Sequence, residues 1–183
     1  MGKTAIIFPG IGYHKDKPLL YYSRRLAKEA GYSVECADFS GIVWEKGDLR
    51  DPAKMNGFLA HAMQCAESCL SDIDTKSDDE LLFISKSIGT AVAARYAKEK
   101  NLNVKQIYFS PIVPFGDFAR DYGMAFYGDN DPLADYTDIE AICVEKKIEG
   151  HRIEGGNHSL ETGDTETDLK KLAWMMGLVK TFI

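Results

Sequence analysis

The stretch that most constrains the fold runs from Leu81 to Ala97 and reads LLFISKSIGTAVAARYA. It begins with four apolar residues, which predict a short buried strand. It ends with apolar residues spaced three and four apart, which predict a helix that buries one face. Only a few residues around Ser87 separate the two parts. The stretch therefore predicts a strand, a tight turn and a helix in direct succession.

The turn places a serine between small residues. Ser85 lies two positions before Ser87, and Gly89 lies two positions after it. This layout is typical of a nucleophile elbow, whose flanking residues must be small because they approach neighbouring backbone. The serine hydroxyl then projects at a helix N-terminus, which favours developing negative charge. The usual pattern has glycine in place of Ser85, and the alternative is an ordinary turn with Ser87 as helix N-cap.

Strand and helix patterns alternate along the rest of the chain. Strands are predicted at 4–8, 33–38, 81–84, 104–109, 123–127 and 151–153, and helices at 18–30, 51–71, 88–97, 133–146 and 166–182. A length of 183 residues suits one domain with one core, spanning 1–183. The alternation predicts an α/β three-layer sandwich, with a mainly parallel sheet of about six strands and helices on both faces.

Charge and cysteine content argue against several kinds of binding partner. The net charge of −6 argues against binding to nucleic acid or to an anionic membrane. No apolar run reaches the length of a membrane span and no signal peptide is evident, so a cytoplasmic protein is expected. Cys65 and Cys69 are one helical turn apart, but no second pair completes a metal site, so buried thiols and no metal are expected. The oligomeric state stays open.

Two loops predicted at carboxyl ends of strands carry groups that activate a serine. Asp129 and Asp131 follow the fifth strand, and His158 follows the sixth. Sites in parallel sheets form at these strand ends, and the chain order of serine, acid and histidine favours a catalytic triad. From the residues alone, Asp129 is a competing acid and Asp131 could cap a helix beginning at Pro132. His158 could also be an ordinary loop histidine.

With these residues the chain resembles the α/β-hydrolase superfamily over nearly its whole length, in a small, nearly lidless form similar to dienelactone-hydrolase-like proteins. The resemblance implies a minimal α/β-hydrolase fold without a cap domain. It implies a serine hydrolase that cleaves a small ester or thioester without a cofactor. Ser87 would be the nucleophile, Asp131, three residues after Gly128, the acid, and His158 the base. Asp131 should then hydrogen-bond Nδ1 of His158. Ser85 departs from the family pattern, and so does the lack of leading antiparallel strands.

The resemblance also implies an oxyanion hole. Its donors would be the backbone N–H groups of Ile88 and of one residue in the loop after the first strand, expected to be Ile11. The substrate site is expected to be lined by Gly12, Tyr13, His14, Ile112, Val113 and Phe115, with Trp44 at its rim. The connection after the fourth strand is too short for a helical lid, which predicts an open site that prefers short acyl groups.

Several other residues have simpler interpretations. Lys86 neighbours Ser87 on the strand, and adjacent strand residues point to opposite faces, so it is expected to reach solvent or to support the site from behind. His61 and His151 are expected to be surface or packing residues. His14 follows the loop after the first strand and is expected to contact substrate rather than to act as a base.

Two alternative functions remain open. A hydrolase fold without catalysis could serve as a binding protein, because a fold alone does not guarantee chemistry. A nucleotide-binding module is suggested by Gly10 and Gly12 after the first strand and by Asp38 at the end of the second. The third glycine of that fingerprint is missing, with Lys15 in its place, and Pro18 delays the helix.

Overall fold

The computed structural model describes residues 2–43, 45, 51–71 and 80–183. Six strands form one sheet in the order β2-β1-β3-β4-β5-β6, and every neighbouring pair is parallel. The strands are β1 (Lys3–Phe8), β2 (Ser33–Cys36), β3 (Glu80–Lys86), β4 (Lys105–Phe109), β5 (Met124–Gly128) and β6 (Glu149–Ile153). The helices are α1 (Pro18–Glu29), α2 (Pro52–Cys69), α3 (Ile88–Glu99), α4 (Tyr136–Glu145) and α5 (Thr165–Phe182), with a 3₁₀ helix η2 (Val113–Asp117). The predicted α/β architecture is confirmed.

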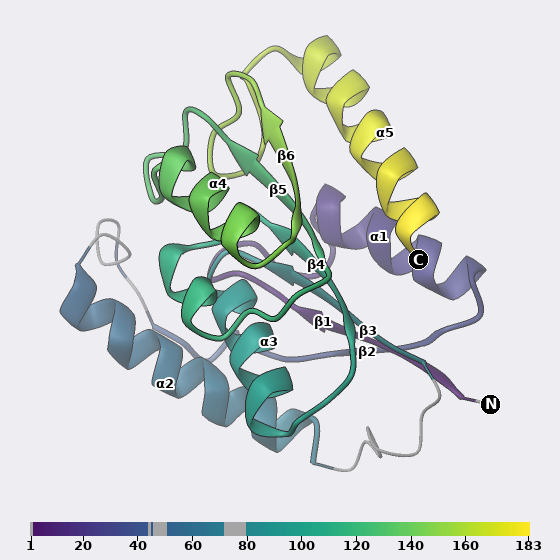
Figure 1. Ribbon diagram of the computed structural model, residues 1–183, viewed down its shortest axis with the longest axis vertical. Helices are drawn as coiled ribbons and strands as arrows, with labels where there is room; N and C mark the ends of the chain where they lie inside the picture. The colour runs from purple at the N-terminus through teal and green to yellow at the C-terminus, as the bar shows by residue number, and fades with distance from the viewer. Residues whose placement is uncertain (1, 44, 46–50, 72–79) are drawn as a thin grey trace.

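Helices cover both faces of the sheet (Figure 1). α1 and α5 lie on one face, and α2, α3 and α4 lie on the other. In β3, Leu81 and Phe83 pack into the cluster beneath α2, α3 and α4, whereas Leu82 and Ile84 pack towards α1 and α5. Successive strand side chains point to opposite faces, so a sheet covered on both sides requires a continuous apolar run. This explains why the central strands read as unbroken hydrophobic segments.

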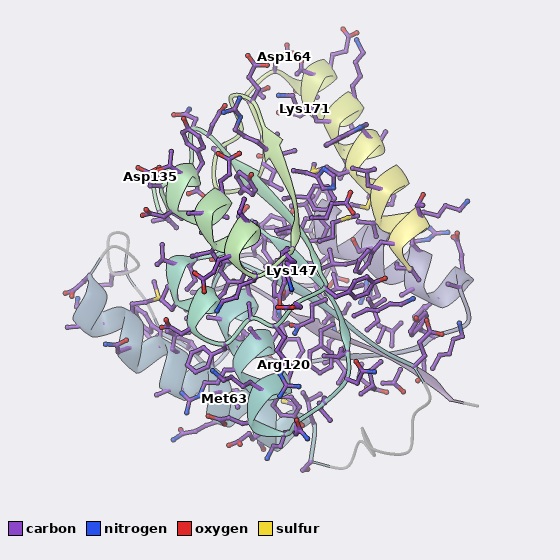
Figure 2. All side chains as sticks on the ribbon, viewed as in Figure 1. Met63, Arg120, Asp135, Lys147, Asp164 and Lys171 are labelled. Atoms are coloured by element: carbon purple, nitrogen blue, oxygen red, sulfur yellow. The ribbon has the colours of Figure 1, made fainter. Side chains whose placement is uncertain are left out.

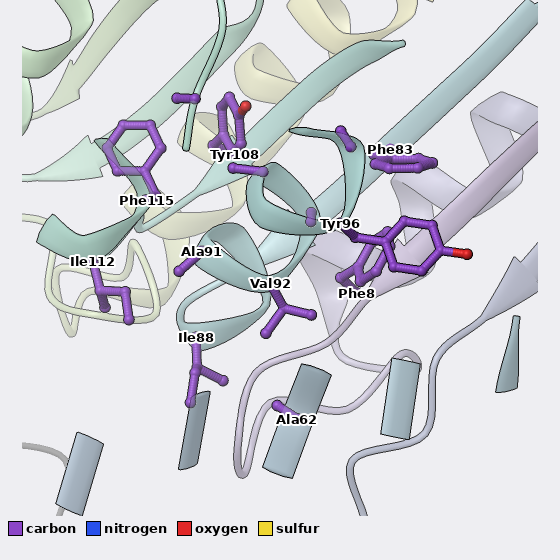
Figure 3. Packing of buried hydrophobic residues seen from close by; sticks show 14 of the residues in the cluster. Phe8, Ala62, Phe83, Ile88, Ala91, Val92, Tyr96, Tyr108, Ile112 and Phe115 are labelled. Atoms are coloured by element: carbon purple, nitrogen blue, oxygen red, sulfur yellow. The ribbon is translucent and has the colours of Figure 1, made fainter. Parts of the chain in front are cut away.

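An aromatic cluster joins the elements that flank the serine turn (Figure 3). The ring centroids of Phe8 and Phe83 are 5.0 Å apart, and they lie 6.1 and 6.2 Å from the ring of Tyr96. These residues belong to β1, β3 and α3 respectively. Tilted aromatic pairs at such distances contribute packing energy beyond the burial of their area. The cluster therefore holds the turn after β3 against the end of β1.

Aspartate caps fix where several helices begin. Asp51, Asp135 and Asp164 each accept a hydrogen bond from a backbone N–H in the first turn of α2, α4 and α5, and Figure 2 labels the last two at their helix ends. Such caps satisfy backbone donors that otherwise lack an intrahelical partner. The helix predicted at 133–146 begins instead at Tyr136, because Asp135 rather than an earlier residue caps it.

The strand order creates the crevice where a site is expected. β1 lies between β2 and β3, so the chain leaves β1 to one side and later returns on the other. In open parallel sheets, ligands bind outside the carboxyl ends of strands at such a switch point. Residues 110–123, between β4 and β5, contain only η2, so no cap domain covers this edge in the part of the chain that the structure describes.

The cysteines differ partly from expectation. Cys65 is half-buried and Cys69 is exposed, so the second is not the buried thiol that was predicted. Across the described residues, no three His, Cys, Asp or Glu side chains gather in a way that could hold a metal ion. Within the same residues, no helix combines the length and apolar character needed to cross a membrane.

Candidate active site

Ser87 has the backbone conformation of a strained turn residue. Its φ of 55° and ψ of −126° lie in a region that residues with a side chain rarely adopt. The turn is held by hydrogen bonds on both sides. The Ser87 N–H donates to the carbonyl of Phe109 at 3.0 Å, and the Thr90 hydroxyl donates to the carbonyl of Ser87 at 2.6 Å. Although Ser87 occupies the N-cap position of α3, its side chain makes no capping hydrogen bond. The hydroxyl is therefore available to another partner.

The small residues around the turn have separate reasons to be small. A Cβ on Gly89 would lie 2.3 Å from the carbonyl oxygen of Phe8 and 2.4 Å from that of Pro9, so no side chain fits there. Ser85 is fully buried, and its hydroxyl donates to the carbonyl of Ile107 at 3.0 Å. A serine can therefore replace the usual glycine at position 85, because its buried hydroxyl has a hydrogen-bond partner.

We expect Gly89→Ala to lower the free energy of unfolding by at least about 2 kcal/mol, because the added methyl group must displace backbone of the loop after β1. Gly177→Ala is the matched control, since a Cβ on this residue of α5 meets no atom within 4 Å. That change should be neutral or stabilising by up to about 1 kcal/mol. Urea unfolding measures both. Equal midpoints for Gly89→Ala and the wild type would contradict the close approach.

Three loops bring Ser87, His158 and Asp131 together. His158 Nε2 lies 2.7 Å from Ser87 Oγ, and His158 Nδ1 lies 2.7 Å from Asp131 Oδ2. An ionised carboxylate can only accept, which places the proton on Nδ1 and leaves Nε2 to accept from the serine hydroxyl. The predicted contact between Asp131 and His158 is confirmed.

The two aspartates of the loop after β5 have different partners. Asp131 is nearly buried, with 3% of its side chain exposed, and its Oδ1 accepts from the Leu133 N–H at 2.8 Å. It caps a turn while it holds His158, but it is not the cap of α4. Asp129 Oδ1 instead accepts from the Gly155 N–H at 2.6 Å and so fixes the loop after β6.

Burial lowers the pKa of His158 from its ordinary value of 6.5. The positive charge of Lys86 lowers this pKa further, while the hydrogen bond to Asp131 and its negative charge raise it. The net direction is downward, so the imidazole is neutral at pH 7. A base must be unprotonated to accept a proton, so this environment suits general-base chemistry.

Two backbone amides near the serine turn lack an acceptor among the described residues. Within the described residues, neither the Ile88 N–H nor the Ile11 N–H donates to a protein acceptor. Gly10 and Tyr13 exchange backbone hydrogen bonds of 3.1 and 3.3 Å across the loop after β1. A Cβ on Gly10 would lie 3.1 Å from the Ser87 Cβ, so this loop passes directly beside the serine.

Two of the residues expected to line a substrate site are buried instead. Tyr13 is buried, and its hydroxyl accepts from the Leu19 N–H, so it points towards α1 rather than outward. Phe115 is fully buried on Tyr108, with ring centroids 5.1 Å apart, because η2 turns it into the core. Phe115 thus offers no surface to a substrate, which corrects that expectation, and Tyr13, at 7% exposed, offers little.

The other expected lining residues differ in exposure. Ile112 is 4% exposed, whereas Val113 is 44% exposed. Gly12, with a φ of 76°, lies in the loop after β1. His14 is exposed, and its Nδ1 accepts from the Asp16 N–H. Trp44 lies outside the described residues.

An open groove of about 530 Å³ lies between the loops after β1 and β2. Its lining includes Gly10, Gly12, His14, Lys15, Asp38 and Ser40. Gly10 connects the groove to Ser87. The glycine loop does not lead directly into a helix, because α1 begins only at Pro18. The dinucleotide fingerprint requires that direct connection, so the groove lacks the helix N-terminus that would hold a pyrophosphate.

Lys86 takes the second of its two expected places. Its side chain is fully buried and does not reach solvent, but it supports the site from behind. Its Nζ donates to the carbonyl of His158 at 2.7 Å and lies 5.0 Å from the ring centroid of Tyr13. Burial lowers the pKa of Lys86 to about 7. The strand alternation carries a signal for this placement, since Lys86 shares the face of Ile84, which packs towards α1 and α5.

The remaining histidines lie away from this cluster. His61 is an exposed residue of α2. The ring of His151 stacks on Phe126 at 5.1 Å between centroids and meets Trp174 edge-on at 5.7 Å. Their predicted roles as surface and packing residues are confirmed.

A family model described as "Alpha/beta hydrolase domain" matches residues 3–183. No curated protein shows significant sequence similarity to the chain. Among solved structures it is similar to Est1E of Butyrivibrio proteoclasticus, with a TM-score of 0.70 and 15% identity over 99% of this chain and 86% of that one. It is also similar to an α/β serine hydrolase without a lid from Xanthomonas campestris (TM-score 0.63, 16% identity, 98% and 79% covered). An esterase of Pyrococcus furiosus gives a TM-score of 0.67 at 14% identity, with 98% and 81% covered.

Proposed function

This chain belongs to the α/β-hydrolase domain family, and we propose that it is a serine hydrolase that cleaves small esters or thioesters. One observation carries the proposal. A strained serine at the strand-to-helix turn is linked to a histidine, and that histidine to a buried aspartate, by two contacts of 2.7 Å. The same constellation performs acyl transfer on several unrelated folds, so its geometry is a stronger argument than the fold alone.

In the proposed mechanism, Ser87 Oγ attacks the carbonyl carbon of the substrate. His158 Nε2 takes the hydroxyl proton as the new C–O bond forms, and Asp131 stabilises the resulting imidazolium. The imidazolium then donates this proton to the departing alcohol or thiol as the bond to the leaving group breaks. Water, deprotonated by His158, attacks the acyl-serine and releases the acid together with the free Ser87 hydroxyl.

The oxyanion of each tetrahedral intermediate needs hydrogen-bond donors that are fixed in advance. The N–H groups of Ile88 and Ile11 are the proposed donors, because neither has an acceptor within the described residues. Ile88 follows Ser87 directly, and Ile11 follows Gly10, whose backbone passes beside Ser87. Ile88 also opens α3, whose N-terminus carries positive potential. Donors that need no reorganisation as charge develops contribute a large share of such catalysis.

The surroundings of the serine favour a small substrate. Among the described elements, none caps the carboxyl edge of the sheet. Of the wall residues expected in the loop after β4, only Val113 is well exposed. The adjoining groove bears charged residues, among them Lys15 and Asp38. A long acyl chain would therefore stay largely in water.

We expect activity on p-nitrophenyl esters to peak between acetate and butyrate and to fall beyond hexanoate. Each additional methylene contributes about 0.8 kcal/mol only when it is buried, and this site buries few. Measuring kcat/KM across the ester series, with Ser87→Ala as the background, tests this preference. A steady rise in kcat/KM out to decanoate would show that a deep acyl tunnel exists and that the open-site interpretation is wrong.

A further inference from the structure

A fully buried lysine lies immediately before the proposed nucleophile. Lys86 has no exposed surface, although lysine is among the residues least often buried. A buried ammonium is costly unless its hydrogen-bonding groups are satisfied. Within the described residues it forms no ion pair with a carboxylate within 4 Å, and its hydrogen-bond acceptor is the carbonyl of His158 at 2.7 Å. A buried charge is thus directed at the backbone of the proposed base.

The same carbonyl has a second, uncharged donor. Ser110, the first residue after β4, is fully buried, and its hydroxyl donates to the His158 carbonyl at 2.9 Å. The backbone of His158 is therefore held from two neighbouring strands. Below about pH 7 one donor carries a charge and the other does not, so in weakly acidic solution the pair separates the effect of position from the effect of charge.

We propose that Lys86 is a positioning residue for His158: its ammonium fixes the backbone of the base loop to the strand that presents Ser87. Lys86 and Ser87 are joined by one peptide bond. The residue that holds the His158 backbone is therefore at a fixed distance from the nucleophile. The inference rests on the proposed function for its catalytic consequence, but the anchoring and its electrostatic effect concern His158 itself.

The charge of Lys86 has a second consequence. It lowers the pKa of His158, which also falls through burial and rises through Asp131. Asp131 and Glu161 act on Lys86 with opposite charge, Lys17 acts with like charge, and the ring of Tyr13 lies against its ammonium. With its own pKa lowered to about 7, Lys86 is still charged while His158 titrates at lower pH. Lys86 therefore helps to keep the base neutral in weakly acidic solution.

The test compares Lys86→Met with Ser110→Ala in the full chain. NMR titration of His158, one of four histidines, measures its pKa without any substrate. In Lys86→Met the pKa of His158 should rise by roughly 0.5 to 1 unit, because a like charge is lost nearby. In Ser110→Ala it should stay within about 0.2 units, since no charge changes. The Met variant should keep at least the wild-type unfolding midpoint, because an apolar side chain replaces a buried charge.

The values of kcat and KM test whether Lys86 positions His158. Lys86→Met should lower kcat on p-nitrophenyl acetate by about 10- to 100-fold with little change in KM, because a misplaced base affects the chemical step. Ser110→Ala should lower kcat by less than about 10-fold, because the charged donor of the pair remains. If Lys86→Met does not fold, Lys86→Leu replaces it, since its side chain likewise carries neither a charge nor a donor for the carbonyl.

The outcomes separate the two proposals. An unchanged pKa of His158 in a folded Lys86 variant overturns the electrostatic part of the inference, and an unchanged kcat overturns the positioning part. If the wild type shows neither ester turnover nor Ser87 labelling, the proposed function fails and the positioning role fails with it. A shifted pKa in that case would still support the contact between Lys86 and the base loop.

Discussion

Ser87→Ala should abolish labelling by a fluorophosphonate and lower ester hydrolysis by about 10⁴-fold or more. The reason lies in the geometry of the turn, which directs the hydroxyl to His158 Nε2 at 2.7 Å instead of into a helix cap. Loss of the nucleophile removes the covalent route, and the remaining groups cannot replace it because the members of a triad act as a unit. The measurement combines mass mapping of the labelled peptide with kcat/KM on p-nitrophenyl acetate.

Ser159→Ala is the matched control for this prediction. Ser159 follows His158 directly, and its backbone N–H, rather than its hydroxyl, donates to Asn157 Oδ1. The variant should therefore keep both labelling and turnover within about threefold of the wild type. Labelling at Ser85, Ser110 or Ser159 in place of Ser87 would show that the nucleophile is misassigned. Labelling at no serine would favour a hydrolase fold that serves as a binding protein.

The topology was accessible from the sequence because it depends on patterns with a physical period. Apolar runs followed by helical spacing predict alternating strands and helices, and such alternation leaves few arrangements besides a parallel sheet. The order of Ser87, Asp131 and His158 then places each residue at the same edge. Helix boundaries were less predictable, because Asp135 competes with Asp131 as a cap and moves the start of α4 to Tyr136.

The sequence could not predict which way several side chains of the site point. Tyr13 and Phe115 follow strands, but a hydrogen bond to the Leu19 N–H and the turn of η2 direct them inward. The direction of the Lys86 side chain was harder still to predict, because lysine is usually exposed at the protein surface. Its burial depends on a carbonyl 72 residues away along the chain, at His158. The strand alternation assigns Lys86 to the face of Ile84, but no local periodicity identifies a partner so far along the chain.

Asp131→Asn should lower kcat by about 10⁴-fold near neutral pH while leaving the fold intact. Asp131 Oδ2 now accepts from His158 Nδ1, which keeps Nε2 free to accept the serine proton. An asparagine amide can donate to Nδ1 instead, which moves the imidazole proton to Nε2. In that tautomer His158 cannot act as a base towards Ser87, although all three side chains remain in place. Single-turnover kinetics with p-nitrophenyl acetate, together with an unfolding curve, measure the effect.

Asp129→Asn provides the control, because the two aspartates share one loop. Asp129 accepts from the Gly155 N–H, and the amide oxygen of an asparagine can accept the same hydrogen bond. Turnover of this variant should stay within about threefold of the wild type. If Asp129→Asn loses as much activity as Asp131→Asn, the acid is misassigned. If Asp131→Asn keeps wild-type kcat, the contact with His158 is structural and the proposed triad is wrong, because a base without its orienting carboxylate has no means of holding the productive tautomer.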